Sequence, residues 1–183
     1  MAHVPTSNEQ ATVVSDADQA ILDELWIKRC QILNQAWVQV RYHKRRQRFF
    51  DLLDKLTKSV TVVLGASLLG QYFRDYLPWL AAAITSLGLL ALVFGYSDRK
   101  QLHKELAEAS AQLIAEIEAA PFAEIDAKCN AGWASAYARI VAKAPPPLKN
   151  LTLICEREQA IFEGYPDHVK SLGKLKILFA QFH

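Results

Sequence analysis

The side chains best suited to metal binding or nucleophilic catalysis are scattered along this sequence, without a spacing that either chemistry uses. No H-E-x-x-H pattern, which places two zinc ligands on one helix face, occurs around the five histidines. The three cysteines form no C-x-x-C pair and are odd in number, so they support neither a zinc site nor a disulfide framework. These residues are His3, His43, His103, His168 and His183, and Cys30, Cys129 and Cys155.

Cys155, beside Glu156, is the one thiol that could be drawn into a nucleophilic set, with His168 as a distant base. No motif supports that set, and a thiol on an apolar helix face behaves as a small hydrophobic side chain. The chain also lacks a P-loop, a G-x-G-x-x-G turn and a G-x-S-x-G elbow. We therefore predict that the protein is not an enzyme and holds no metal or cofactor.

The charge of the chain is nearly balanced and does not indicate a nucleic-acid partner. The formal net charge is +2 over 183 residues. Residues 1–58 carry nine Lys or Arg against seven acids, and residues 98–183 carry eleven of each. A basic excess confined to one short stretch differs from the broad basic surface of a nucleic-acid binder.

Two uncharged segments in the middle of the chain predict a transmembrane helical hairpin. Residues 76–97 are long enough for a helix to cross about 30 Å of hydrocarbon. Residues 59–73 span only about 22 Å as a helix, but the long side chains of Lys55, Lys58 and Arg74 can snorkel to lengthen that span. Only Arg74 and Asp75 separate the two segments. The alternative is a soluble helical protein that buries the hairpin.

Basic residues flank both segments and orient the hairpin. Positive flanks stay in the cytoplasm. We therefore expect a protein of the bacterial inner membrane with both termini on its cytoplasmic side and the Arg74–Asp75 turn on its outer side. The same side chains can contact anionic lipid at the bilayer surface. They are Arg41, Lys44, Arg45, Arg46, Arg48 and Lys58 before the hairpin, and Arg99 and Lys100 after it.

Small residues recur along the apolar segments and predict close helix packing. Small side chains let two helix backbones approach within van der Waals contact in lipid. The packing could join the two arms of one hairpin or two copies of the chain, and the sequence leaves both open. The positions are Gly65 and Gly70 in the first segment, and Ala81, Thr85, Gly88 and Gly95 in the second.

The rest of the chain predicts an all-α protein whose long amphipathic helices extend the hairpin into a cytosolic helical bundle. We expect a disordered stretch at 1–15, an amphipathic basic helix at 16–58, the hairpin at 59–97 and a cytosolic helical region at 98–183. The helix of the second span should continue past Asp98, with His103 outside its apolar stripe. That stripe is expected at Leu102, Leu106, Ala109, Leu113, Ile117 and Ala120.

This layout resembles the SLATT domains, two-transmembrane effector domains of bacterial conflict systems. The resemblance covers a basic RxxKRRxR helix, two short apolar segments with a minimal turn, and a long helix that starts SDRKQLH. It implies an oligomeric, pore-forming effector of anti-phage defence that permeabilises the inner membrane, with a nucleotide-sensing or regulatory partner protein. The alternative is a membrane-anchored scaffold whose cytosolic helices bind a partner without pore activity. The resemblance rests on Arg41, Lys44, Arg45, Arg46, Arg48, Arg99, Lys100 and His103.

Overall fold

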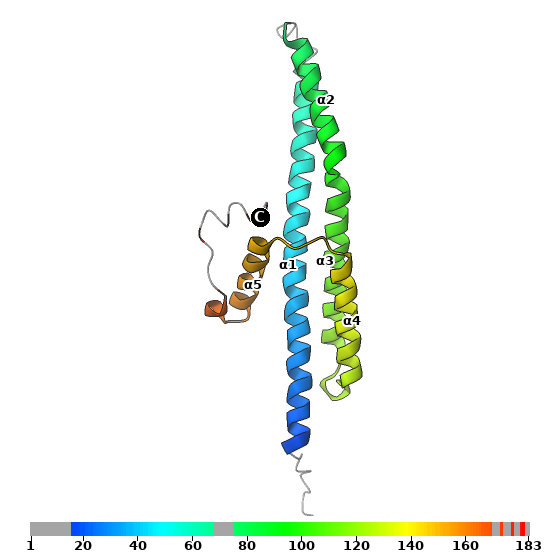
Figure 1. Ribbon diagram of the computed structural model, residues 1–183, viewed down its shortest axis with the longest axis vertical. Coiled ribbons are helices and arrows are strands. Elements are labelled where there is room, and N and C mark those ends of the chain that lie inside the picture. Colours follow the sequence, from blue (N-terminus) through cyan, green and yellow to red (C-terminus); the bar gives the residue numbers. More distant parts are fainter. Residues whose placement is uncertain (1–15, 68–74, 170–172, 174–176, 178–179, 182–183) are drawn as a thin grey trace, which may run out of the picture.

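The computed structural model describes residues 16–67, 75–169, 173, 177 and 180–181, and these residues form an elongated helical rod (Figure 1). Within the described residues there is no strand, so the predicted all-α class is confirmed. The stretch expected to be disordered, 1–15, lies outside the described residues. The elements are α1 (Asp16–Ser67), α2 (Leu77–Phe94), α3 (Tyr96–Ala119), η2 (Phe122–Glu124), α4 (Ala127–Lys143), α5 (Lys149–Phe162) and η3 (Pro166–His168).

Helix α1 is the long axis of the rod, and all the longer helices pack along it (Figure 1). No glycine or proline interrupts the chain between Ala17 and Leu64, so nothing in that stretch breaks the helical hydrogen-bond ladder. The result is one helix of 52 residues, about 78 Å long. It passes through the basic cluster without a break, from the amphipathic basic helix predicted at 16–58 into the apolar segment.

Helices α2 and α3 follow one another and run back along α1 in the antiparallel direction (Figure 1). The sequence predicted one helix through residues 76–97 and beyond, but α2 ends at Phe94. Gly95 adopts φ 54° and ψ 46°, a left-handed conformation that side chains with a Cβ disfavour. Helix α3 then starts at Tyr96, so the two helices meet at a glycine joint.

The main core joins α1, α3 and α4 in the half of the rod distant from α2. Side chains of α4 cover this core from the side, and Asn130 Nδ2 donates to the Leu25 carbonyl of α1 at 3.0 Å. Asp126 caps α4 by accepting a hydrogen bond from the Cys129 backbone N–H at 2.6 Å. The buried members of the core are Ile32, Ala36, Val40, Leu113, Ile114 and Ile117.

Helix α5 packs on the other side of α1, so α1 is covered on two sides. Prolines 145–147 end α4, and the following segment crosses α1 to reach α5 (Figure 1). Gly164, with φ 87°, follows the end of α5 in the left-handed conformation typical of a helix stop. The buried residues of this second cluster are Tyr42, Leu151, Cys155 and Ala180.

One stretch of the described residues, Leu77–Ala119, contains a helical segment long and apolar enough to cross a membrane. Its most apolar 18-residue window has no residue buried in the protein. The other predicted span, residues 59–73, is described only as far as Ser67, and residues 68–73 lie outside the described residues. The structure therefore contains one candidate membrane helix, packed beside the C-terminal part of α1.

Candidate functional site

The contact between α1 and α2 is lined by leucine and threonine. The half-buried side chains of α2 recur at steps of three and four, which places them on the side that faces α1: Leu77, Leu80, Ile84, Leu87 and Ala91. On α1, Thr57 and Thr61 are half-buried. Their hydroxyls donate to the carbonyls of Leu53 and Thr57, at 2.8 and 2.9 Å, so neither hydroxyl hydrogen is left unpaired.

The small residues predicted to pack helices lie mostly outside that contact. Ala81, Thr85 and Gly88 are exposed, and a Cβ added at Gly88 or Gly65 would meet no atom within 4 Å. Gly95 acts at the joint between α2 and α3 through its positive φ. Gly70 lies outside the described residues. Among the described residues, Ala81, Thr85 and Gly88 therefore lie outside the α1–α2 contact.

Two of the predicted membrane-interface arginines instead contact α5. Arg41 Nε donates to Gln159 Oε1 at 2.8 Å, and Arg45 forms an ion pair with Glu158. The partners are more than 110 residues apart in sequence. These side chains attach α5 to α1, next to the buried Cys155.

Other members of the basic set join α1 to α3 or face solvent. Asp51 of α1 accepts from Lys55 at 2.7 Å and from Lys100 of α3 at 2.9 Å. Hydrogen bonds from Lys55 and then Lys100 hold the pKa of Asp51 at about 2, and Asp51 in turn raises the pKa of Lys100. Lys58 pairs with Asp54 of its own helix at 2.7 Å. Lys44 and Arg48 are exposed.

A buried histidine pair joins α1 to α3 just beyond these ion pairs, and sequence reasoning missed it. His43 Nδ1 and His103 Nδ1 are 2.9 Å apart, and the two residues are 1% and 2% exposed. Such a bond requires one ring to carry its proton on Nδ1 and the other to accept there. The Phe50 ring stacks on His103 with centroids 5.6 Å apart. His103 was expected outside the apolar stripe of its helix, and that expectation is wrong, because the buried face of α3 is His103, Leu106, Ala107, Ser110, Leu113, Ile114 and Ile117.

Burial and neighbouring charge keep both histidines neutral. Desolvation, followed by the nearby His103, lowers the pKa of His43 to about 4. Desolvation, followed by the positive charges of Arg46 and Arg99, lowers the pKa of His103 to about 4. The spacing of His103 with Leu106, Ser110 and Leu113 is the sequence signal that would have found the pair, because these positions share one helix face.

The described residues contain no group of three or more His, Cys, Asp or Glu side chains that could hold a metal ion. Burial raises the pKa of the Cys155 thiol to about 12, so it is almost entirely protonated near neutral pH and is a poor nucleophile. Cys30, in contrast, is exposed. No protein-family model, curated protein or solved structure matches this chain.

Proposed function

We propose that the chain is a membrane-embedded effector that oligomerises and permeabilises the bacterial inner membrane, as its resemblance to SLATT domains implies. The observation that carries the membrane part is the exposure of α2. This helix is uncharged along its length and has no buried residue, with Leu92 and Val93 each more than three-quarters exposed. An apolar surface of this size is unfavourable in water and typical of a surface that contacts lipid or another protein.

The dimensions of the apolar end support a bilayer as its environment. Helix α2 has 18 residues and a length of about 27 Å, close to the hydrocarbon thickness of about 30 Å. Val62 and Val63 of α1 are exposed beside it. Tyr76 and Trp79, 62% and 77% exposed, lie near the tip of the rod, where aromatic rings favour a membrane–water interface.

The outward small residues support assembly between copies. Lipid tails are as apolar as leucine, so helices in a bilayer associate through close backbone contact. Ala81, Thr85 and Gly88 offer such a surface, and no described residue of the hairpin covers it. In this proposal a second copy packs against it, and the assembled hairpins open the membrane.

The proposal is tested by replacing small residues of this surface with larger apolar ones, so that the helix stays apolar but close backbone contact is blocked. In the variant Ala81→Leu with Gly88→Leu, insertion should persist, whereas oligomer size and the loss of membrane potential on expression should both fall. A matched control is Ala82→Leu with Ala83→Leu, which also places two leucines at exposed positions of α2 but on other faces. A test variant that depolarises cells as strongly as the wild type, while the control behaves identically, contradicts the pore proposal.

A second candidate, the membrane-anchored scaffold, is favoured by an apolar groove at the other end of the rod. A cavity of about 590 Å³ lies between the N-terminal part of α1 and the end of α5, with exposed Trp26, Ile27, Phe162 and Tyr165 around it. A partner helix with an apolar face could bind there. Expression that leaves the membrane potential intact, with a bound partner lost on Trp26→Ala, would favour the scaffold.

A further inference from the structure

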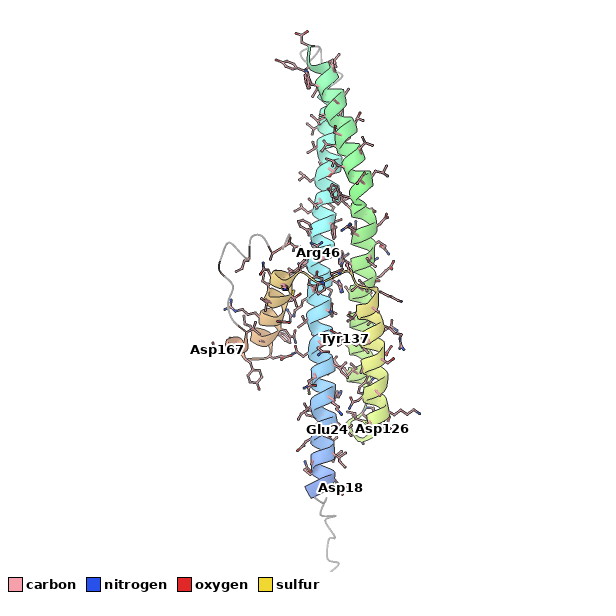
Figure 2. All side chains as sticks on the ribbon, in the orientation of Figure 1. Asp18, Glu24, Arg46, Asp126, Tyr137 and Asp167 are labelled. Atoms are coloured by element: carbon pink, nitrogen blue, oxygen red, sulfur yellow. The ribbon has the colours of Figure 1, made fainter. Side chains whose placement is uncertain are left out.

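A cavity of about 490 Å³ lies where α1, α3 and the segment between α4 and α5 meet. Figure 2 labels Arg46 on α1, near the level at which that segment crosses the helix. Helices α1 and α3 supply the polar lining with Tyr42, Arg46, Arg99 and His103, and Pro145 and Pro146 form part of the outer wall.

The two guanidinium groups in this cavity have no carboxylate partner among the described residues. Arg46 Nη1 donates to the Gln181 carbonyl at 2.9 Å. Both guanidiniums lie over the Phe50 ring, with Cζ atoms 4.6 Å (Arg46) and 6.0 Å (Arg99) from its centroid. After desolvation, Arg99 is among the groups that lower the pKa of Arg46. Two cations gathered without a counter-charge create a positive potential inside the cavity, and that potential attracts an anion.

We propose that this cavity binds a phosphate group, held by Arg46 and Arg99 and by a hydrogen bond from the Tyr42 hydroxyl. The planar guanidinium fork matches two oxygens of a phosphate. Tyr42 Oη accepts from the Leu148 backbone N–H at 3.1 Å and donates to no acceptor among the described residues, so its proton can be donated to the ligand. The volume lies in the range of small-ligand pockets, roughly 300–1,000 Å³, so a phosphate ester fits with its substituent against the proline wall.

Two sources share this chemistry: the headgroup of an anionic phospholipid and a soluble phosphate ester. Arg99 is four residues beyond Gly95, where the exposed apolar helix α2 ends, so a headgroup at the bilayer surface lies within reach of the cavity. This first source rests on the proposed membrane insertion. A soluble ester needs no bilayer and enters from water. Either ligand would tie α1 and α3 to the segment that leads to α5.

Binding is tested on the full chain in a non-ionic detergent, by calorimetric titration with inorganic phosphate and with glycerol phosphate. The main variant is Arg99→Gln, because the Arg99 guanidinium donates no hydrogen bond within the described part of the chain and the fold does not depend on one. The matched control is Arg139→Gln, because Arg139 is exposed on α4 and does not line the cavity. Arg99→Gln should weaken binding about tenfold or more, through loss of a charged hydrogen-bond pair, and the control should bind as the wild type does.

Flotation with vesicles separates the two sources. Wild-type binding to phosphatidylglycerol over phosphatidylcholine vesicles that falls in Arg99→Gln, but not in Arg139→Gln, assigns the site to a lipid headgroup. Arg99-dependent titration with the soluble phosphates, without vesicle preference, assigns it to a soluble ester. Absence of saturable binding to every probe, or equal loss in Arg139→Gln, overturns the proposal. The detergent titration involves no membrane crossing, so it can succeed even where the depolarisation test of the proposed function fails.

Discussion

The Nδ1 atoms of His43 and His103 lie 2.9 Å apart and connect α1 to α3 at the level where the apolar arms meet the larger helical core. One ring donates and the other accepts, so the bond exists only while at least one imidazole is neutral and carries no proton on Nδ1. Arg46 and Arg99 lie beside His103 and oppose its protonation. The pair is therefore a sensitive point of the contact between the two long helices.

Acidification should destabilise the protein through this pair. The pKa of each histidine is about 4 in the folded chain against an ordinary value of 6.5, so the unfolded state binds more protons between these values. The stabilisation is complete above pH 6.5 and is lost as the pH falls toward 4, on the order of 3 kcal/mol for the first proton. Thermal unfolding in detergent, followed by circular dichroism at stepped pH, measures the loss.

The double variant His43→Asn with His103→Asn separates the pair from the carboxylates that also titrate in acid. Paired amides can still donate and accept, but they do not ionise in this range. The pH slope of its unfolding temperature between 6.5 and 4 should be clearly shallower than that of the wild type. Equal slopes would show that the histidine pair is not the source of the acid sensitivity.

The cysteines should differ sharply in reactivity. Cys30 is exposed, whereas Cys155 is fully buried with a pKa raised to about 12. At pH 8 in the folded state, iodoacetamide should alkylate Cys30 and leave Cys155 unmodified until denaturant is added. Mass spectrometry of peptides after timed quenching gives the two rates. Labelling of Cys155 as fast as that of Cys30 would refute the packing of α5 on α1.

The glycine joint should tolerate a methyl group less well than the neighbouring glycine of α2. Gly95→Ala places a Cβ at φ 54° and should lower the free energy of unfolding by about 1–2 kcal/mol, or straighten the joint and disturb the α1–α3 contact. Gly88→Ala is the matched control, because a Cβ there meets no atom within 4 Å. Chemical unfolding of both variants in the same detergent compares them. If Gly95→Ala and Gly88→Ala have equal free energies of unfolding, and the Lys100–Asp51 ion pair is intact in both, then the left-handed conformation at position 95 is not required for the fold.

The proposed orientation in the membrane can be read by cysteine labelling. Single cysteines at Asp75, Arg48 and Lys104 are all at exposed positions, so burial in the protein does not obscure the result. With the three native cysteines replaced, an impermeant maleimide added to intact cells should label the Asp75→Cys variant and neither of the others. The opposite pattern would reverse the topology, and labelling at all three positions would exclude a sealed crossing.

Local sequence signals account for most of the helix boundaries. The absence of glycine and proline before Gly65 permits the long first helix, prolines 145–147 mark the end of α4, and Gly164 marks the end of α5. These signals succeed because helix termination depends on residues within a turn of the boundary. The break at Gly95 escaped prediction, since an isolated glycine in an apolar helix is compatible with either conformation.

Long-range pairing explains what the sequence did not reveal about the site. Arg41 and Arg45 were predicted at the membrane interface, and the sequence did not reveal that their partners Gln159 and Glu158 lie on α5. No local pattern links residues so distant in the chain. The burial of His103 was missed for a different reason. The expected apolar stripe began at Leu102, which is 37% exposed, whereas the buried face of α3 begins one residue later, at His103.

The two arms of the apolar end are mechanically unequal. Helix α1 is one continuous helix of 52 residues, so a rotation applied near Trp26 turns its apolar end through nearly the same angle. The antiparallel arm consists of two helices, α2 and α3, that meet at Gly95. The glycine backbone can absorb a rotation of one helix relative to the other through changes in φ and ψ. A force on the end of the rod near Trp26 therefore twists α1 against the arm formed by α2 and α3 instead of moving both as a rigid body.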